Sequence, residues 1–159
     1  MVTVLPFRGH LASKHFVKKI ICRPYDVLNT AEARAIAHGN PQSFLHVKRA
    51  EIDLPEDTDR YSNLVYQTAK YNLDNFIQFG WMEQDTESRY YIYSQEYLGK
   101  KQFGLMCTSS VSDYENNLVR KSEKTILEKE QDRTRLTDTL SANTGPVCLT
   151  YRSDDNRAI

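Results

Sequence analysis

Apolar residues recur at helical spacing in two stretches of the chain. One stretch, residues 61–79, carries an apolar stripe with positions three and four residues apart, and it ends at Gly80. The members of this stripe are Leu64, Val65, Ala69, Leu73, Phe76 and Ile77. This spacing is typical of a helix that buries one face in a core, and glycine often ends such a helix. The second stretch, residues 125–140, is rich in charged residues but contains Leu136 and Leu140, and we expect a second main helix there.

A shorter helix is predicted to begin after Asn29. Asn29 and Glu32 have the spacing of a capping box, in which each side chain accepts a hydrogen bond from the other residue's backbone N–H. Gly39 suits the left-handed position that closes a helix, and Pro41 cannot continue one.

Strand-forming residues predict a β-hairpin around residues 89–111. Residues 89–97 are rich in tyrosine, residues 99–101 have the composition of a turn, and residues 102–111 return with alternating apolar positions. Further short strands or extended segments are expected at residues 2–8, 43–47, 118–119 and 147–151. Residues 16–22 are expected to form a strand or a short turn that leads into one.

This irregular alternation of helices and strands predicts an α+β fold with a small mixed or antiparallel sheet. Residues 51–59 are acidic and contain a proline, so we expect a surface loop there. The chain length suits one compact domain. We expect an N-terminal α+β subregion at 1–84, a second subregion at 85–151 and a loose tail at 152–159.

Composition narrows the classes of function. No apolar run approaches the roughly 20 residues of a membrane span, and the N-terminus lacks the pattern of a signal peptide, so we expect a cytoplasmic protein without membrane attachment. Lys+Arg and Asp+Glu both number 21, which argues against a dedicated nucleic-acid binder. The cysteines Cys22, Cys107 and Cys148 are far apart and lack metal-ligand spacing, so each is interpreted as a small buried residue.

Residues 119–138 form the densest charge cluster and are the main candidate site. Glu123 precedes the predicted helix and could act as a general base, while Lys121 and the helix start at Thr125 would suit a phosphate group. Further along, Asp132 and its neighbouring carboxylates could help to hold Mg²⁺, because this ion prefers oxygen ligands.

A solvated helix face is the simpler interpretation of the same residues. However, the spacing of four residues pairs Glu128 with Asp132 and Lys129 with Arg133, and like charges at this spacing destabilise a helix. A helix selected only for solubility would more often pair opposite charges, so we favour a functional origin for this charge pattern.

Two other positions are candidates for a binding site. Pro24 makes a rigid turn that displays Arg23, Tyr25 and Asp26 together, either as a site wall or as ordinary packing and capping. His46 lies inside an apolar run, where a histidine is more often a hydrogen-bonded core residue than a ligand.

Several phrases of the sequence together resemble a prokaryotic family of domains of unknown function that carries the number 1015. They are Leu5-Pro6-Phe7-Arg8-Gly9, Arg23-Pro24-Tyr25-Asp26-Val27-Leu28, Gly39-Asn40-Pro41-Gln42-Ser43-Phe44-Leu45-His46-Val47, Glu51-Ile52-Asp53-Leu54-Pro55, Lys129-Glu130-Gln131-Asp132-Arg133-Thr134 and Thr144-Gly145-Pro146-Val147. They occur in the family's order over almost the whole chain. Family members are usually longer, and this implies that the chain is an N-terminal fragment or a truncated product.

The resemblance also implies similarity to the ParB/sulfiredoxin-like fold, which includes kinases of free serine, for the second half of the chain. By this similarity Glu123 is the catalytic carboxylate of a motif that the family usually writes His-Glu-x-Thr. Here the motif is Ser122-Glu123-Lys124-Thr125, and the family's next block, Asp-Gly-His-His-Arg, is absent.

These observations lead to three functional hypotheses. In the first, the chain is the N-terminal part of a small-molecule kinase. This kinase would use ATP or ADP with Mg²⁺, and a hydroxylated metabolite such as serine would accept the phosphate. The second is a non-catalytic ligand-binding or regulatory domain with the same fold, and the third and weakest is a ParB-like nucleic-acid-associated protein. For the kinase, Glu123 would be the base, with substrate or phosphate groups bound by the other candidates: Arg23, Tyr25, Asp26, His46, Lys121, Thr125, Asp132 and Arg133.

Overall fold

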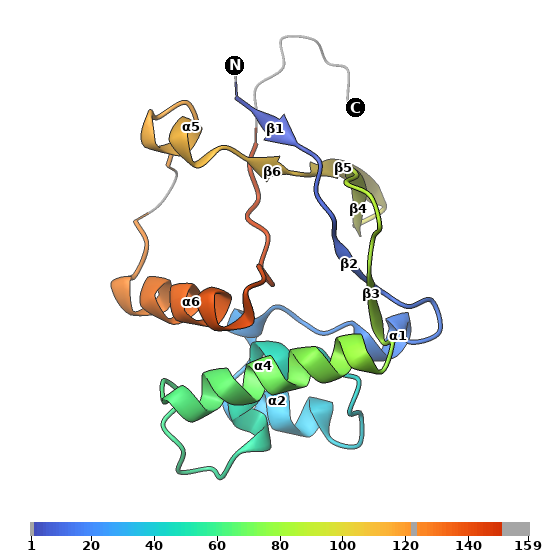
Figure 1. The fold of residues 1–159 in the computed structure, drawn as a ribbon, viewed down its shortest axis with the longest axis vertical. Coiled ribbons are helices and arrows are strands. Elements are labelled where there is room, and N and C mark those ends of the chain that lie inside the picture. Colours follow the sequence, from blue (N-terminus) through green and yellow to red (C-terminus); the bar gives the residue numbers. More distant parts are fainter. Residues whose placement is uncertain (1, 122–123, 151–159) are drawn as a thin grey trace. The chain divides into compact units, whose positions relative to one another are not determined.

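The computed structural model of the chain describes residues 2–121 and 124–150. This described part is a mixture of short and long helices with three two-stranded sheets, of which the pairs β1–β6 and β4–β5 are antiparallel (Figure 1). The predicted α+β class with small antiparallel sheets is therefore confirmed.

The chain divides into two compact units, each built from segments that are separated in sequence. The helical unit comprises Leu11–Glu83 and Thr125–Pro146, and the strand unit comprises Met1–His10, Gln84–Lys124 and Val147–Ile159. The division into subregions at 1–84 and 85–151 stays a prediction.

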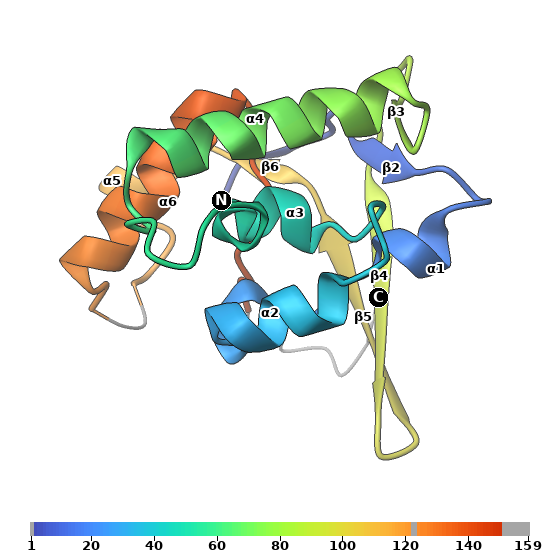
Figure 2. The same cartoon turned by 90° about the horizontal axis from the view of Figure 1, so that it is seen from below.

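The helical unit is organised around α4 (Asn63–Gln78). Its other elements are α1 (Val17–Ile20), η1 (Tyr25–Val27), α2 (Thr30–Ala37), α3 (Leu45–Lys48), η2 (Ala50–Asp53) and α6 (Leu127–Leu140). Helix α3 lies between α2 and α4 (Figure 2), because its residue Leu45 packs with the α2 side and Val47 with the α4 side.

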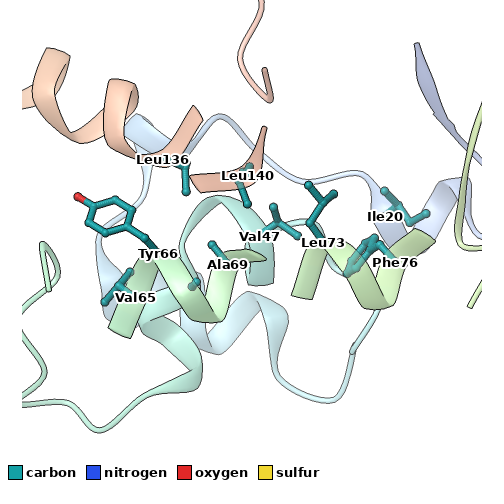
Figure 3. Close-up of a cluster of buried hydrophobic side chains, with 10 residues drawn as sticks. Ile20, Val47, Val65, Tyr66, Ala69, Leu73, Phe76, Leu136 and Leu140 are labelled. Atoms are coloured by element: carbon teal, nitrogen blue, oxygen red, sulfur yellow. The ribbon is translucent and has the colours of Figure 1, made fainter. Parts of the chain in front are cut away.

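The buried face of α4 forms one side of the main core (Figure 3). Its members Val65, Tyr66, Ala69, Leu73 and Phe76 keep the predicted helical spacing and pack against a second set of apolar side chains. This second set consists of Ile20, Val47, Ala50, Leu136 and Leu140.

Two residues of the predicted stripe are outside this core. Leu64 and Ile77 are exposed. A helix turns about 100° per residue, so Leu64 faces away from Tyr66, which lies two positions further on. Ile77 belongs to the last turn of α4.

The capping box before α2 is confirmed. The Asn29 side chain accepts a hydrogen bond from the backbone N–H of Glu32 at 2.9 Å, and the Glu32 carboxylate accepts from the N–H of Asn29 at 2.8 Å. Gly39 follows the helix with φ of +71°, as expected for a left-handed position. Ala33 and Ala37 of α2 pack in a smaller core with Leu28, Leu45 and Ile52.

Two predicted strands of this unit are wrong. Residues 43–47 lead into helix α3, and residues 16–22 contain helix α1. A short apolar run fits a buried strand and a buried helix equally well, and the backbone here forms the helical hydrogen bonds from residue i+4 to residue i. The predicted loop at 51–59 is also partly wrong, because it begins within the 3₁₀ helix η2 and buries Glu51 and Ile52.

The strand unit contains the predicted hairpin. Strand β4 (Tyr91–Tyr97) pairs with β5 (Lys100–Met106) in an unbroken antiparallel register. The turn is Leu98-Gly99, one residue earlier than predicted, and both residues have positive φ. Positive φ at both central positions is the geometry of a two-residue type I′ turn, which matches the twist of the strands.

The remaining strands are short. Strand β1 (Val4–Leu5) pairs with β6 (Thr108–Ser109), and β2 (His10–Ala12) pairs with β3 (Met82–Gln84) where the chain passes between the two units. Helix α5 (Val111–Glu115) follows β6.

Two predicted strands of the strand unit are not formed in the described residues. The backbone N–H groups of Leu118 and Val119 donate to the carbonyl oxygen of Asp113, so this dipeptide closes α5 instead of pairing with a strand. Residues 147–150 carry no strand, and residue 151 lies outside the described part. The prediction that every cysteine is buried is also wrong, because Cys148 is exposed and Cys22 and Cys107 are partly exposed.

A tyrosine anchors the N-terminal segment of the strand unit. The hydroxyl of Tyr91 accepts a hydrogen bond from the N–H of Gly9 at 2.8 Å and donates one to the carboxylate of Asp85 at 2.6 Å. A Cβ atom on Gly9 would lie only 3.0 Å from this hydroxyl oxygen. The close approach of backbone to side chain therefore favours glycine at this position.

Within the described residues, every helix is too short or too polar to cross a membrane.

Candidate functional site

Within the helical unit, a buried arginine that belongs to an ion pair holds the Arg23-Pro24-Tyr25 turn in place. Arg49 and Glu51 are both buried, and Nε of Arg49 lies 2.7 Å from Oε1 of Glu51. Neither atom has a well-aligned hydrogen bond, so the two groups are best described as an ion pair that neutralises both charges. The Arg49 guanidinium also donates to the carbonyl oxygens of Tyr25 and Leu28, at 3.0 and 3.1 Å.

The ring of Tyr25 then meets two cations from different helices. The guanidinium carbon of Arg133, on α6, lies 4.2 Å from the ring centroid, and Nζ of Lys48, on α3, lies 5.8 Å from it. Tyr25 and Arg133 were both candidates from the sequence, and the structure brings them together. A cation over an aromatic face is held by the ring's quadrupole.

Asp132 fixes the other side of Arg133. The Asp132 carboxylate is buried, accepts a hydrogen bond from the Tyr66 hydroxyl at 2.8 Å, and accepts another from Nε of Arg133 at 3.0 Å. Burial, followed by the hydrogen bond to Asp132, raises the pKa of Tyr66 to about 12. The Tyr66 hydroxyl therefore stays protonated and acts as a donor that orients the carboxylate.

Two further arginines of the helical unit lie over tyrosine rings. Arg60 is 5.0 Å from the ring centroid of Tyr61, and Arg135 is 4.6 Å from that of Tyr66. Arg135 also donates to the carbonyl oxygen of Tyr61 at 2.9 Å and to the side chain of Asn63. Stacking of this kind leaves the N–H edge of a guanidinium able to bind another group.

A small cavity opens among these groups. It has a volume of about 20 Å³, which is room for about one water molecule. Its charged lining consists of Lys48, Arg49, Glu51, Arg60, Asp132 and Arg133. Four cations face two carboxylates, so two positive charges are in excess. Three of the four cations do not belong to the Arg49–Glu51 pair. We call these three the cationic cluster: Lys48, Arg60 and Arg133.

His46 belongs to a separate network. Its Nδ1 lies 2.7 Å from the carboxylate of Asp53, and its Nε2 lies 3.1 Å from the carbonyl oxygen of Asn40. Both partners are acceptors, so both ring nitrogens must carry a proton. The pKa of His46 is accordingly raised, chiefly by the hydrogen bond to Asp53. Asn72 donates to the carbonyl oxygen of His46 and to Asp53, which ties this network to α4.

The other predicted site residues are not part of the cationic cluster. Arg23 and Asp26 are exposed. Thr125 is exposed and precedes the first residue of α6. Lys121 belongs to the strand unit, where Nζ lies 4.6 Å from the ring centroid of Tyr114. Glu123, the predicted base, lies outside the described residues.

Sequence reasoning missed Lys48, Arg49, Glu51, Arg60 and Tyr66. No local signal marks the buried pair, because Arg49 and Glu51 flank Ala50 beside another charged residue, Lys48. Charged residues in such a stretch are mostly exposed. Lys48 and Arg60 carry no signal either, since basic residues are usually solvated.

The cofactors expected from the sequence are Mg²⁺ and ATP or ADP. In residues 2–121 and 124–150, no three His, Cys, Asp or Glu side chains come together as a metal site. The cavity beside the cationic cluster is far smaller than an adenine nucleotide. The binding of these cofactors to the chain stays a prediction.

Comparison with known proteins gives one match. A family model described as "Protein of unknown function (DUF1015)" matches residues 4–159. No curated protein and no solved structure matches the chain significantly. The match confirms the family resemblance read from the sequence phrases. Similarity to the ParB/sulfiredoxin-like fold and to serine kinases stays a prediction.

Proposed function

The chain belongs to the DUF1015 family of proteins of unknown function, and we propose that its helical unit binds the anionic group of a small metabolite, a phosphate or a carboxylate. The observation that carries the proposal is the excess of positive charge around the cavity lined by Lys48, Arg60 and Arg133. Guanidinium groups in particular match the geometry of phosphate and carboxylate oxygens.

The charge of the cationic cluster is not fully compensated by the described protein. Lys48 and Arg60 form no ion pair with any residue in the described ranges. Arg133 is paired with Asp132, but about a third of its side chain is exposed. An anion that enters the cavity can therefore meet N–H donors from more than one cation.

Within the cluster, Arg133 is held in place before any ligand arrives. Arg133 is held between the Tyr25 ring and the Asp132 carboxylate, which the buried hydroxyl of Tyr66 orients in turn. Ordering a free side chain on binding costs about 0.5–1.5 kcal/mol. Fixing Arg133 in the folded protein removes most of this cost from the binding step.

The size of the cavity limits what part of a ligand it takes. A volume of about 20 Å³ accepts a terminal oxygen of an anionic group but not a sugar or a base. We infer that the ligand places its phosphate or carboxylate at the cluster while the rest of the molecule stays outside the cavity.

Phosphoryl transfer is a second candidate function of the same site. Two sequence phrases that carry the family resemblance meet at the cluster, because Tyr25 belongs to one and Asp132 and Arg133 to the other. In this hypothesis a nucleotide with Mg²⁺ phosphorylates a hydroxylated metabolite such as serine. Glu123 would accept the hydroxyl proton, and Arg133 would bind the substrate carboxylate or the phosphate.

Ligand-induced thermal stabilisation tests the binding proposal. We expect orthophosphate and phosphoserine to raise the melting temperature of the wild-type protein and to have little effect on Arg133→Gln. Arg135→Gln is the matched control, because Arg135 also stacks on a tyrosine but does not line the cavity. It should respond like the wild type. A flat response of the wild type to phosphate, phosphoserine and serine would remove the proposal.

Turnover separates the two candidate functions. If the protein is a kinase, ATP or ADP with Mg²⁺ and serine should give phosphoserine, and Glu123→Gln should lose turnover while it keeps phosphate binding. Stabilisation by ligand without any turnover supports a binding or regulatory domain instead. Salt-dependent binding to DNA in place of either result would favour the nucleic-acid hypothesis.

A further inference from the structure

The cavity beside the cationic cluster contains a buried carboxylate with an unused hydrogen-bonding position. Glu51 lines this cavity and is only 8% exposed. Among the described residues, no group donates a well-aligned hydrogen bond to its Oε1 atom, although Nε of Arg49 lies 2.7 Å away. Buried polar atoms nearly always have a hydrogen-bond partner. The Glu51 carboxylate can therefore accept a hydrogen bond from a group that enters the cavity.

The guanidinium of Arg49 is held by other partners. Its Nη1 donates to the carbonyl oxygens of Tyr25 and Leu28, and its Nη2 donates to the hydroxyl of Thr30 at 3.0 Å. Because the guanidinium is planar and rigid, these bonds also set the direction of its Nε–H. Nε is close enough to Glu51 to neutralise its charge, but it is not aligned to donate a hydrogen bond to Oε1.

The other carboxylate of the cavity already has its donors. Oδ1 of Asp132 accepts from the hydroxyl of Tyr66 at 2.8 Å, and Oδ2 accepts from Nε of Arg133 at 3.0 Å. Each oxygen of this carboxylate is thus engaged by the protein. Of the two carboxylates that line the cavity, Glu51 is the one whose hydrogen-bonding capacity is left for a ligand.

We propose that the cavity binds a phosphate group that still carries a proton, and that the Glu51 carboxylate accepts the hydrogen bond of its P–OH. This inference rests on the proposed anion site and narrows its ligand class. The cationic cluster offers N–H donors to the charged oxygens, while the cavity, with room for one terminal oxygen, receives the protonated one.

The same arrangement rejects anions without a proton. HPO₄²⁻ meets both conditions, because it is charged and keeps one O–H group. Sulfate and carboxylates carry no proton at neutral pH, so their oxygens would lie against the Glu51 carboxylate with like charge and no hydrogen bond between them. Repulsion of the wrong ligand is a common source of specificity.

Relative affinities in one mildly alkaline buffer test this inference. Orthophosphate and sulfate are then both tetrahedral dianions, but only orthophosphate keeps a proton. We expect isothermal titration calorimetry at constant ionic strength to show at least about tenfold tighter binding of orthophosphate to the wild-type protein, because one hydrogen bond to a charged group separates the two ligands.

Glu51→Gln tests the role of the carboxylate itself. A glutamine amide can donate to sulfate as well as accept from phosphate, so we expect the ratio of the two affinities to fall to about one. The ratio is informative because the lost negative charge strengthens the binding of both dianions alike. Asp74→Asn is the matched control, since it neutralises an exposed carboxylate of α4 that does not line the cavity, and it should keep the wild-type ratio. An unchanged ratio in Glu51→Gln would overturn the inference.

Methyl phosphate provides a test on the wild-type protein alone, in case Glu51→Gln fails to fold. A phosphate monoester loses its last proton with a pKa of about 6. Methyl phosphate should therefore bind below this pKa and weaken in the alkaline buffer, where orthophosphate still binds. Equal affinities for orthophosphate, sulfate and methyl phosphate in that buffer would overturn this inference and leave the anion site standing. If none of the three binds at either pH, the proposed function fails as well.

Discussion

Single residues set the close contacts of this protein, and Gly9 is the clearest example. Its backbone N–H lies 2.8 Å from the hydroxyl of Tyr91, whose position is fixed by a second hydrogen bond to Asp85. No sequence pattern indicates this contact, because the partners are 82 residues apart. The glycine is therefore explained only by the folded structure.

Gly9→Ala is expected to lower the free energy of unfolding by about 1–2 kcal/mol, since the new methyl group must displace a hydrogen-bonded hydroxyl. Urea unfolding measures the change. Gly104→Ala is the control in the same unit, because a Cβ there meets Tyr93 at an ordinary 4.0 Å. Equal stability of the two variants would show that Tyr91 moves aside without cost.

His46 gives the protein a defined pH dependence. Its pKa is raised above the ordinary value of 6.5, because both ring nitrogens donate hydrogen bonds in the folded state. The charged form therefore stabilises the fold fully below about pH 6.5, and this stabilisation is lost as the pH rises through the folded-state pKa. His46→Gln should remove this part of the pH profile in urea unfolding, whereas His38→Gln, which changes an exposed histidine, should keep it. A wild-type profile that does not fall with rising pH in this range would contradict the assignment.

At the scale of elements, the long or well-capped elements were predictable and the short ones were not. Helix α4 and the β4–β5 hairpin have periods that repeat several times, and α2 has a complete capping box. The four-residue helix α3 was expected as a strand, because its apolar run is too short to show a period. Its conformation is fixed by packing between α2 and α4, which no local pattern reveals.

The candidate site was predictable only in part for the same reason. The sequence identified Tyr25, Asp132 and Arg133 through a turn, unusual like-charge spacing and a family phrase. Lys48 and Arg60 join them because α3 and the segment before α4 fold against α6. Such meetings of distant segments depend on tertiary structure, so residue type alone could not predict them.

The buried ion pair Arg49–Glu51, at the junction of α3 and η2, leads to a testable prediction. Glu51→Ala would leave the Arg49 guanidinium buried without its counter-charge, so we expect a loss of about 3–5 kcal/mol in the free energy of unfolding. Asp74→Ala, which breaks the exposed pair of Lys70 and Asp74 on α4, should cost less than about 1 kcal/mol. Similar losses from both variants, measured by urea unfolding, would mean that Arg49 reaches solvent.

At the scale of the whole molecule, stability and exposure are unequally distributed. The helical unit contains the buried apolar residues of the described chain and also the cationic cluster. The strand unit exposes apolar side chains on β4 and β5, among them Ile92, Phe103 and Leu105. Binding sites are most accurate when they are built on packed, rigid elements, and this supports placing the ligand site in the helical unit.

An NMR titration with orthophosphate tests the central claim most directly. The arginine Nε–Hε signals of a ¹⁵N-labelled protein report separately on Arg60, Arg133 and Arg135. The account predicts saturable shifts at Arg60 and Arg133, little change at Arg135, and an affinity that is about tenfold weaker in Arg133→Gln, because a hydrogen bond to a charged group is lost. Shifts that do not saturate, or that are strongest at Arg135, would contradict an anion site at the cationic cluster.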